Sequence, residues 1–417
     1  MSNLSEPLLP LSGLRVIDWT HVLAGPFVGY QLALLGAEVI RIERPDQDDM
    51  IRSTAVDPEL GELGLGEAYL GQGAGKRSVA LDAKSAEGRA ILRKLIANAD
   101  VLVENFRPGK LRALGLDPAA LIQEHPKLIV CSVTGFGPNS DRRAYDHVVQ
   151  AASGLMVANA SAQGTPRRVG FPLVDYGVGQ QAAMAVLAAL YRRDAGARER
   201  SCGEWIQVSM MGAALTLMAP AYIETIVSGR ARPRSASTAF SGSPVSGTFK
   251  VADGWIAVVC NATAQTEGLF AALESCSADP AALSKLREAI VASDVDAAQR
   301  VLGEILQGKS AADWELSLAS HGVPGTVVRS PAEAATEASK AWPRITLPAT
   351  RSSSGRTVAV PGIGFTSTEP MTHEVLRSPP RRGQDTRAVL SELGMGVDQI
   401  DELISAGLAA EPDATAR

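Results

Sequence analysis

Cysteine, histidine and aromatic residues are scarce in this chain of 417 residues, which has four cysteines, five histidines and 5 % Phe, Trp and Tyr. No two cysteines have the CxxC spacing of zinc or redox motifs, and the histidines have no metal-ligand spacing. We therefore expect no disulfide framework and no metal site, and reduced thiols in a cytoplasmic protein. The residues concerned are Cys131, Cys202, Cys260, Cys276, His21, His125, His147, His321 and His373.

The chain has no excess of positive charge. Its 40 Lys and Arg residues are outnumbered by 45 Asp and Glu residues, which gives a formal net charge of −5. Nucleic-acid binding usually needs a basic face, so we expect no nucleic-acid partner. A local basic pocket for an anionic ligand stays compatible with this balance.

Long hydrophobic runs are absent as well. The first seven residues, Met-Ser-Asn-Leu-Ser-Glu-Pro, hold no basic segment followed by an apolar one, so no secretory signal is expected. The longest uncharged apolar stretch, at about 206–223, is interrupted by Gly212 and Pro220. It is more typical of a buried helix than of a membrane span, and we expect no membrane partner.

Three nucleotide and hydrolase motifs are missing. The chain has no GxGxxG after its first expected strand and no GxSxG elbow, which argues against a nicotinamide site and a serine hydrolase. Residues 71–78 resemble a phosphate loop, but Leu70 replaces its first glycine and Arg77 its Ser or Thr. A glycine-rich segment with two adjacent cations, Lys76 and Arg77, can still cradle a phosphate.

The N-terminal pattern predicts an open α/β sheet. Residues 14–18 form an expected strand, a helix at 28–35 ends at Gly36, and a second strand follows at 38–43. Strand, helix and strand with short links indicate a parallel βαβ unit, and the pattern then repeats. Further strands are expected at 78–81, 101–103 and 128–133, and helices at 85–97 and 118–125.

The rest of the chain changes character after two expected helices at 179–193 and 207–227. A loop rich in Ser, Gly, Arg and Pro (228–247) is followed by a hairpin pattern and short amphipathic helices. A proline-rich extended tail then leads to two helices at 386–393 and 397–406. With 46 % hydrophobic residues, the length predicts two domains or one large domain with an insert. We divide the chain into 1–228, a small domain at 229–330, and a return segment at 331–417.

Several segments carry a specific resemblance that spans nearly the whole chain. Together they resemble the family III CoA-transferases, the group that includes formyl-CoA transferase, carnitine CoA-transferase and the α-methylacyl-CoA racemases. The segments are 20–26, 35–45, 76–78, 81–82, 100–109, 135–138, 322–324, 330–334 and 380–386.

This resemblance implies an architecture and a set of partners. The family has a Rossmann-like, doubly wound large domain built from both termini, and a smaller domain between them, here α+β. Its two chains form an interlocked homodimer. No cofactor is bound permanently, and coenzyme A enters as part of the acyl-CoA substrate, with a free carboxylic acid as the second substrate.

The resemblance also assigns a catalytic residue. In the transferases an Asp stands just ahead of the long Ala-rich helix, and here it is Asp175; without the family context, an Asp there is more typical of a helix cap. The racemases add a His in a Gly-His-Asp arrangement, and Tyr145 fills that position, while His147 lies two residues further on. We therefore favour a transferase, with an α-methylacyl-CoA racemase or epimerase and a non-catalytic CoA-binding protein as alternatives.

A lone carboxylate suits CoA transfer through covalent intermediates. The Asp attacks the thioester to give an aspartyl anhydride, and the CoA thiolate then gives an aspartyl-CoA thioester. We expect Asp175 to be readily ionised beside helix amides. In the family, backbone amides bind the tetrahedral oxyanion, some of them from a glycine-rich loop that corresponds to residues 239–247 here.

The resemblance further implies ten CoA contacts, several of them arginines suited to phosphates. Leu23 replaces a Gln of formyl-CoA transferase, and residues 73–75 replace an Asn-rich segment, which argues against formyl-CoA and oxalate. Succinyl-CoA or another dicarboxylyl-CoA is our hypothesis for the donor, from family frequency and from Arg230, Arg232 and Arg234. The ten expected contacts are His21, Val22, Arg44, Lys76, Arg77, Asn105, Phe106, Arg107, Arg143 and Tyr145.

Overall fold

The computed structural model describes residues 9–161, 163–195, 202–230, 242–342, 345–350 and 357–412. A seven-stranded sheet with the order β12-β3-β2-β1-β4-β5-β6 is its centre. All neighbouring pairs from β3 to β6 are parallel, and β12 alone pairs antiparallel, with β3. The strands are β1 (Arg15–Trp19), β2 (Glu38–Glu43), β3 (Lys76–Leu81), β4 (Val101–Glu104), β5 (Ile129–Thr134), β6 (Trp205–Ser209) and β12 (Ala409–Ala410).

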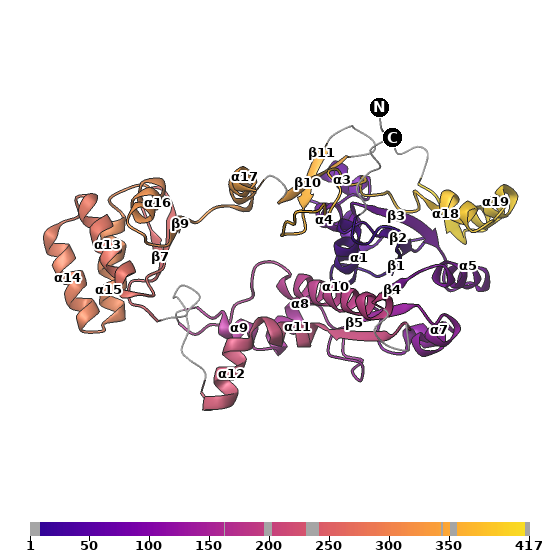
Figure 1. Ribbon diagram of the computed structural model, residues 1–417, viewed down its shortest axis with the longest axis horizontal. Coiled ribbons are helices and arrows are strands. Elements are labelled where there is room, and N and C mark those ends of the chain that lie inside the picture. Colours follow the sequence, from indigo (N-terminus) through magenta and orange to yellow (C-terminus); the bar gives the residue numbers. More distant parts are fainter. Residues whose placement is uncertain are drawn as a thin grey trace. The chain divides into compact units, whose positions relative to one another are not determined.

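Both faces of this sheet are covered by helices, which confirms the expected mixed α/β architecture (Figure 1). Side chains alternate between the faces, so Val16 joins one core cluster and Ile17 the other. One face packs against α1 (Ala24–Leu34), α10 (Leu173–Asp194) and α11 (Met210–Leu217). The opposite face packs against α5 (Ala86–Ala97), α6 (Lys110–Ala113), α7 (Pro118–Glu124), α18 (Thr386–Glu392) and α19 (Val397–Ser405).

Local signals in the N-terminal part behave as expected. Gly36 ends α1 with a left-handed φ of 98°, and the Ser85 hydroxyl caps α5 by accepting the Gly88 amide at 2.9 Å. The strands begin or end within two residues of the expected positions.

The strand order fixes where a ligand can bind. The sequence of strands reverses direction between β1 and β4, because β2 and β3 lie on one side of β1 and β5 and β6 lie beyond β4. In open parallel sheets the loops diverge at such a point and leave a crevice beyond the carboxyl ends of the strands. A ligand site is therefore expected after Trp19 and Glu104.

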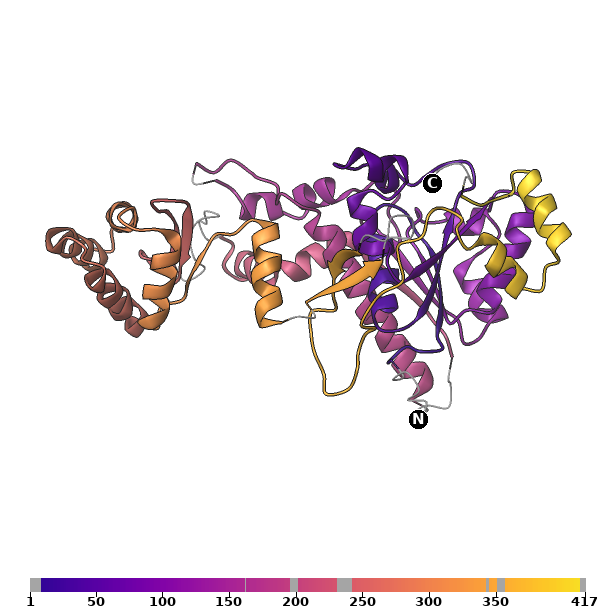
Figure 2. The same ribbon diagram turned by 90° about the horizontal axis from the view of Figure 1, so that it is seen from above.

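The chain separates into two compact units. The larger comprises Met1–Leu155, Val169–Tyr222 and Ser339–Arg417, and the smaller comprises Met156–Arg168 and Ile223–Ala338. In Figure 2 the yellow C-terminal helices lie beside purple helices of the N-terminal part, within the larger unit. The domain limits at 228/229 and 330/331 stay predictions.

The smaller unit is an antiparallel sheet with helices around its own core cluster. The expected hairpin is confirmed, since β7 (Gly247–Lys250) pairs antiparallel with β8 (Trp255–Val258), and β9 (Gly325–Val327) adds a third strand. Its long helices are α13 (Thr263–Ser275), α14 (Pro280–Val291), α15 (Val295–Leu306) and α16 (Ala311–Ser320).

Short elements complete the described chain. A hairpin of β10 (Thr346–Thr350) and β11 (Thr357–Pro361) interrupts the tail, which was expected to be only extended. The remaining helices are α2 (Met50–Ser53), α3 (Pro58–Glu62), α4 (Glu67–Gly73), α8 (Asp146–Ala152), α9 (Leu155–Ala158), α12 (Ala219–Ser228) and α17 (Pro331–Ala341).

One expected helix is wrong. The stretch 207–227 is the end of β6 followed by α11 and α12, which meet at a bend of 80° around Met218. Pro220 explains the break, since it lacks an amide hydrogen and its ring clashes with the preceding turn. None of α12 is buried, contrary to the expected buried helix. By length and composition alone, α10 could cross a membrane, and so could the bent pair of α11 and α12. This is weak evidence for a membrane span, because half of the apolar window of α10 is buried in the core.

Candidate active site

A cleft of about 280 Å³ lies at the carboxyl ends of β1, β4 and β5, where the strand order reverses. It brings Asp175 together with seven of the ten expected CoA contacts. These seven are His21, Val22, Asn105, Phe106, Arg107, Arg143 and Tyr145. The loops that carry them follow three different strands, so the fold gathers residues that are more than 150 positions apart.

Asp175 lies in the first turn of α10, because this helix begins at Leu173, six residues before its expected start. The side chain is 9 % exposed, and none of the described residues donates a hydrogen bond to its carboxylate. Burial, and in second place the charge of Asp146, raises the pKa of Asp175 to about 7. The expectation that helix amides make Asp175 readily ionised is therefore wrong.

Asp146 takes the helix amides that Asp175 was expected to use. Its Oδ1 accepts the amide of Val174 at 2.7 Å and that of Asp175 at 3.4 Å. Its Oδ2 accepts Nε2 of Gln150 at 2.6 Å, and both side chains are buried. An anion at a helix N-terminus is stabilised by the helix dipole, so here that stabilisation goes to Asp146. The sequence indicated no role for this residue beyond its pairing with Tyr145.

The loop after β1 holds an unusual backbone. Val22 has a φ of 64°, a left-handed conformation that a β-branched residue rarely adopts. Asn105 fixes the preceding residue, since its Oδ1 accepts the His21 amide at 2.9 Å and its Nδ2 donates to the His21 carbonyl at 2.8 Å. This pair joins the ends of β1 and β4 across the crevice.

Three arginines give the cleft a positive wall. Arg107, Arg142 and Arg143 line it, and none of them has an ion-pair partner among the described residues. The Arg142 guanidinium lies 3.9 Å from the ring centre of Phe136. Unpaired guanidinium groups beside a carboxyl suit an anionic ligand such as a phosphate ester.

Lys76 and Arg77 lie outside the cleft, contrary to expectation. Lys76 is fully buried, and its Nζ donates to Asp18 at 2.7 Å and to the Pro26 carbonyl at 2.6 Å. It sits beneath α1, where a Cβ at Gly29 would come within 3.2 Å of Nζ. Arg77 is held by two carboxylates, Glu38 and Glu392, at 2.6 Å each. Both cations are therefore committed to ion pairs of the fold.

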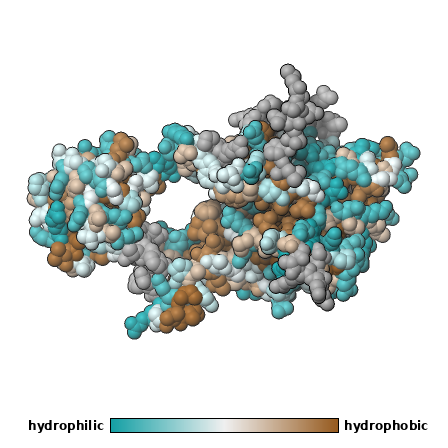
Figure 3. Space-filling model, viewed as in Figure 1, coloured by the Kyte–Doolittle hydropathy of each residue, from teal (hydrophilic) through white to brown (hydrophobic). Residues whose placement is uncertain are grey.

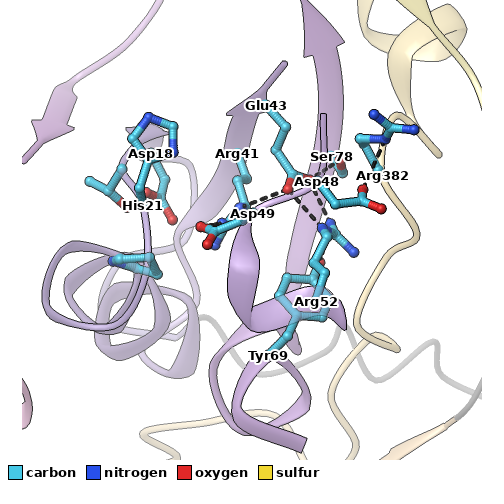
Figure 4. A network of polar contacts seen from close by, with 12 residues as sticks. Asp18, His21, Arg41, Glu43, Asp48, Asp49, Arg52, Tyr69, Ser78 and Arg382 are labelled. Atoms are coloured by element: carbon cyan, nitrogen blue, oxygen red, sulfur yellow. Dashed lines mark hydrogen bonds and ion pairs between the residues drawn. The ribbon is translucent and has the colours of Figure 1, made fainter. Parts of the chain in front are cut away.

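Arg44 lines a neighbouring hollow that also contains His21 and Val22. It is exposed and pairs with Asp46 at 2.6 Å. Beneath this hollow lies a buried ionic network (Figure 4). The Glu43 carboxylate accepts Nη2 of Arg52 at 2.5 Å and the Ser78 hydroxyl at 2.6 Å.

A second hollow, of about 410 Å³, does not contain Asp175. It lies on the far side of residues 106–108, between Glu104 and Trp205, and shares Thr134 with the cleft. We place the chemistry in the smaller cleft because only that cleft combines a buried carboxyl with three unpaired arginines.

Comparison with known proteins points to one family. The family model CoA-transferase family III matches residues 11–386. Succinate–glutarate CoA-transferase of Agrobacterium fabrum is 36 % identical over 236 residues, which cover 55 % of this chain and 58 % of that protein. The human succinyl-CoA:glutarate CoA-transferase is 29 % identical over 403 residues, with 96 % and 90 % covered. The chain thus spans under two thirds of the Agrobacterium relative, but most of the human one.

Solved structures show the same fold. A CaiB/BaiF family protein from Brucella suis superposes with a TM-score of 0.79 and 25 % identity, over 92 % of this chain and 99 % of that one. A hypothetical protein (Rv3272) from Mycobacterium tuberculosis gives a TM-score of 0.72 and 26 % identity, over 92 % and 100 %.

Proposed function

Since this chain belongs to CoA-transferase family III, we propose that it transfers CoA from an acyl-CoA thioester to a free carboxylic acid, with Asp175 as the nucleophile. One observation supports this role above the others. Asp175 is the buried carboxyl of the cleft at the point where the strand order reverses, and its oxygens are free of hydrogen bonds from the described residues. It is thus available to attack a bound carbonyl.

The proposed exchange has four steps that balance. An Asp175 oxygen attacks the thioester carbonyl, the carbon–sulfur bond breaks, and CoA departs as a thiolate. An acyl-aspartyl anhydride forms on the protein. The thiolate attacks the aspartyl carbon and releases the donor acid, which leaves an aspartyl-CoA thioester. The acceptor carboxylate then attacks this thioester and expels the thiolate. Attack of the thiolate on the acceptor's acyl carbon gives the new acyl-CoA and restores Asp175.

The positive wall of the cleft is the proposed site for the CoA phosphates. Arg107 and Arg143 come from the loops after β4 and β5, with Asn105 and Tyr145 beside them. We leave Lys76 and Arg77 out of this site because both are engaged in ion pairs elsewhere. Of the arginines named for a dicarboxylate, Arg230 is exposed, while Arg232 and Arg234 lie outside the described residues.

The donor and the assembly are also proposals. The names of the Agrobacterium and human relatives contain succinate and succinyl-CoA, which supports a succinyl-CoA or similar dicarboxylyl-CoA donor. An interlocked, cytoplasmic homodimer would cover the apolar surface of α12, which Figure 3 shows in brown. Its exposed side chains include Tyr222, Ile223, Ile226 and Val227. Of the proposed oxyanion loop 239–247, residues 239–241 lie outside the described residues.

The decisive experiment traps the covalent intermediate. The protein is incubated with succinyl-CoA and then with hydroxylamine, and a hydroxamate at Asp175 is sought by peptide mass spectrometry. Asp175→Asn should lose the adduct and CoA exchange together. Asp194→Asn, at the exposed far end of the same helix, should keep both. Full exchange by Asp175→Asn would show that this carboxyl has no covalent role, whereas a wild-type protein that binds CoA without exchange would be a CoA-binding protein.

The racemase alternative is separated by solvent exchange. A chiral α-methylacyl-CoA is incubated in deuterated water without an acceptor acid. A transferase leaves the α-hydrogen in place, whereas an epimerase incorporates deuterium. Rapid uptake that depends on Asp175 would replace our proposal with the epimerase.

A further inference from the structure

The loop between β1 and α1 forms one wall of the cleft in a strained conformation. A valine at a φ of 64° is a steric outlier, which persists only where the surrounding structure imposes it. The other two residues of this kind that the structure describes, Ser277 and Ser293, belong to the smaller unit and lack a branched Cβ. Something near Val22 must therefore hold it.

Two buried side chains bind both polar groups of Val22. Its amide donates to Oδ2 of Asp49 at 2.8 Å, and its carbonyl accepts Nε2 of Gln72 at 2.8 Å. Asp49 is itself fixed by Arg41, whose Nη2 donates to the same oxygen at 2.7 Å. If either bond to Val22 were lost, its peptide could rotate towards a negative φ and move the start of α1.

The side chains that hold Val22 also carry buried polar atoms without hydrogen bonds in the part of the chain that the structure describes, which lowers the stability of the fold. Gln72 is fully buried, yet its Oε1 has no donor among the described residues, and Nη1 of Arg41 is also without a partner there. A buried polar atom without a hydrogen bond is destabilising, and an apolar side chain of the same size would avoid it. Gln72 therefore contributes little to stability that Met could not supply.

We propose that Gln72 and Asp49 are positioning residues that hold Val22 left-handed and so set the wall against which CoA binds. This inference rests on the proposed function, because it takes the cleft to be the CoA site. Neither side chain lines the cleft itself, so both act through the loop. Their bonds run from α4 and from the start of α2, which explains why these short elements pack beside the site.

The test compares stability with affinity. In Gln72→Met the amide is lost at nearly constant volume. We expect unfolding by urea to show equal or higher stability, while the dissociation constant of CoA, measured by calorimetry, rises about tenfold. A bond with only a structural role would give the opposite pair of results: lower stability and unchanged affinity.

Rescue by glycine makes the test specific. Glycine adopts a positive φ without strain. Val22→Gly combined with Gln72→Met should therefore bind CoA more tightly than Gln72→Met alone. Ser293→Gly is the matched control, since it relieves a φ of 56° in the smaller unit. It should raise stability and leave the tenfold loss of the Gln72→Met protein uncorrected.

Three results would overturn the proposal, and the first two concern CoA affinity. One is unchanged CoA affinity in Gln72→Met, and the other is equal recovery with Val22→Gly and Ser293→Gly. If Gln72→Met does not fold even with Val22→Gly, Gln72 is a structural residue and the proposal is wrong. The urea measurements need no CoA, so coupling between positions 22 and 72 is tested even if the wild-type protein binds none.

Discussion

Asp146 accepts the main-chain amide of Asp175 at 3.4 Å, and its charge faces the carboxyl that the family resemblance assigns to catalysis. The same carboxylate thus anchors the helix that carries Asp175 and disfavours the ionisation of its side chain. Positioning and electrostatics are opposed in this pair. The cleft carries positive charge on Arg107, Arg142 and Arg143. These arginines can interact both with a bound anionic ligand and with the Asp175 carboxylate.

The first prediction concerns the pH profile. The proposed attack by Asp175 requires its ionised form, so CoA transfer should rise with pH through about 7. Asp146→Asn keeps an oxygen for the Val174 amide and removes the negative charge, so the pKa of Asp175 should fall. The acidic limb of the kcat/KM profile should then move to lower pH. A limb that stays in place would mean that Asp146 acts on Asp175 through packing alone.

The second prediction concerns stability at the same residue. The pKa of Asp175 is raised to about 7 in the folded protein, against an ordinary value of 3.8. The protonated carboxyl therefore contributes to the free energy of unfolding fully below about pH 3.8, and this contribution is lost as the pH rises through 7. Asp175→Asn should therefore be more stable than the wild type at pH 8, by on the order of 2–4 kcal/mol. The difference should shrink towards pH 4. Urea unfolding at both pH values measures it, and equal stability at pH 8 would contradict the raised pKa.

The third prediction concerns the buried network of Figure 4. Burial by itself raises the pKa of Glu43. The charges of Arg52 and Arg41 outweigh burial and hold this pKa well below its usual range. Glu43→Gln leaves the buried Arg52 guanidinium without its carboxylate and leaves Arg41 with Asp49 alone. It should lower the free energy of unfolding by about 3–5 kcal/mol at pH 7.

The pH dependence of that loss has the opposite sign to the case of Asp175. The stability that Glu43 contributes is present above about pH 4.5 and is lost as pH falls below it. The difference in free energy of unfolding between wild type and Glu43→Gln should therefore become smaller in acid. Glu38→Gln is the control, since Glu38 pairs with Arg15 and Arg77 in a partly exposed position and should cost at most about 1 kcal/mol.

The fourth prediction concerns the packing of the two helices that flank the cleft. A Cβ at Gly179 of α10 would lie 2.9 Å from Phe27 Cδ1 and 3.0 Å from the Ala24 carbonyl of α1. Gly179→Ala should push the helices apart, lower stability by about 1–3 kcal/mol and reduce CoA transfer. In α15, a Cβ at Gly303 meets Phe249 only at 3.8 Å, so Gly303→Ala should leave transfer unchanged. Thermal unfolding and initial rates measure both variants.

Much of this architecture follows from local sequence. The alternation of strands and helices, the glycine after α1 and the serine before α5 are signals within a few residues, and the structure confirms them. The hairpin of β10 and β11 was missed because Pro348, which argues against a central strand, is accepted in a two-stranded edge. The two-residue β12 is too short to carry a pattern.

The site was harder to predict because its properties arise between distant residues. Asp175 could be named from the family segments, and the structure places it in the cleft. Its raised pKa depends on burial and on Asp146, which lies 29 positions earlier, and no spacing rule indicates that contact. Lys76 illustrates the same limit. A lysine beside glycines suggests a phosphate site, whereas its real partner, Asp18, is 58 positions away.

The C-terminal segment has a consequence for how the protein is made. Arg52 and Tyr69 donate to the Pro380 carbonyl, the Gly383 amide donates to Ser78, and β12 covers the outer edge of β3. None of these partners exists until more than 300 further residues have left the ribosome. During translation the nascent large unit therefore carries an open strand edge and an incomplete charged core. The smaller unit has a core cluster of its own, so its folding does not have to wait for these C-terminal partners.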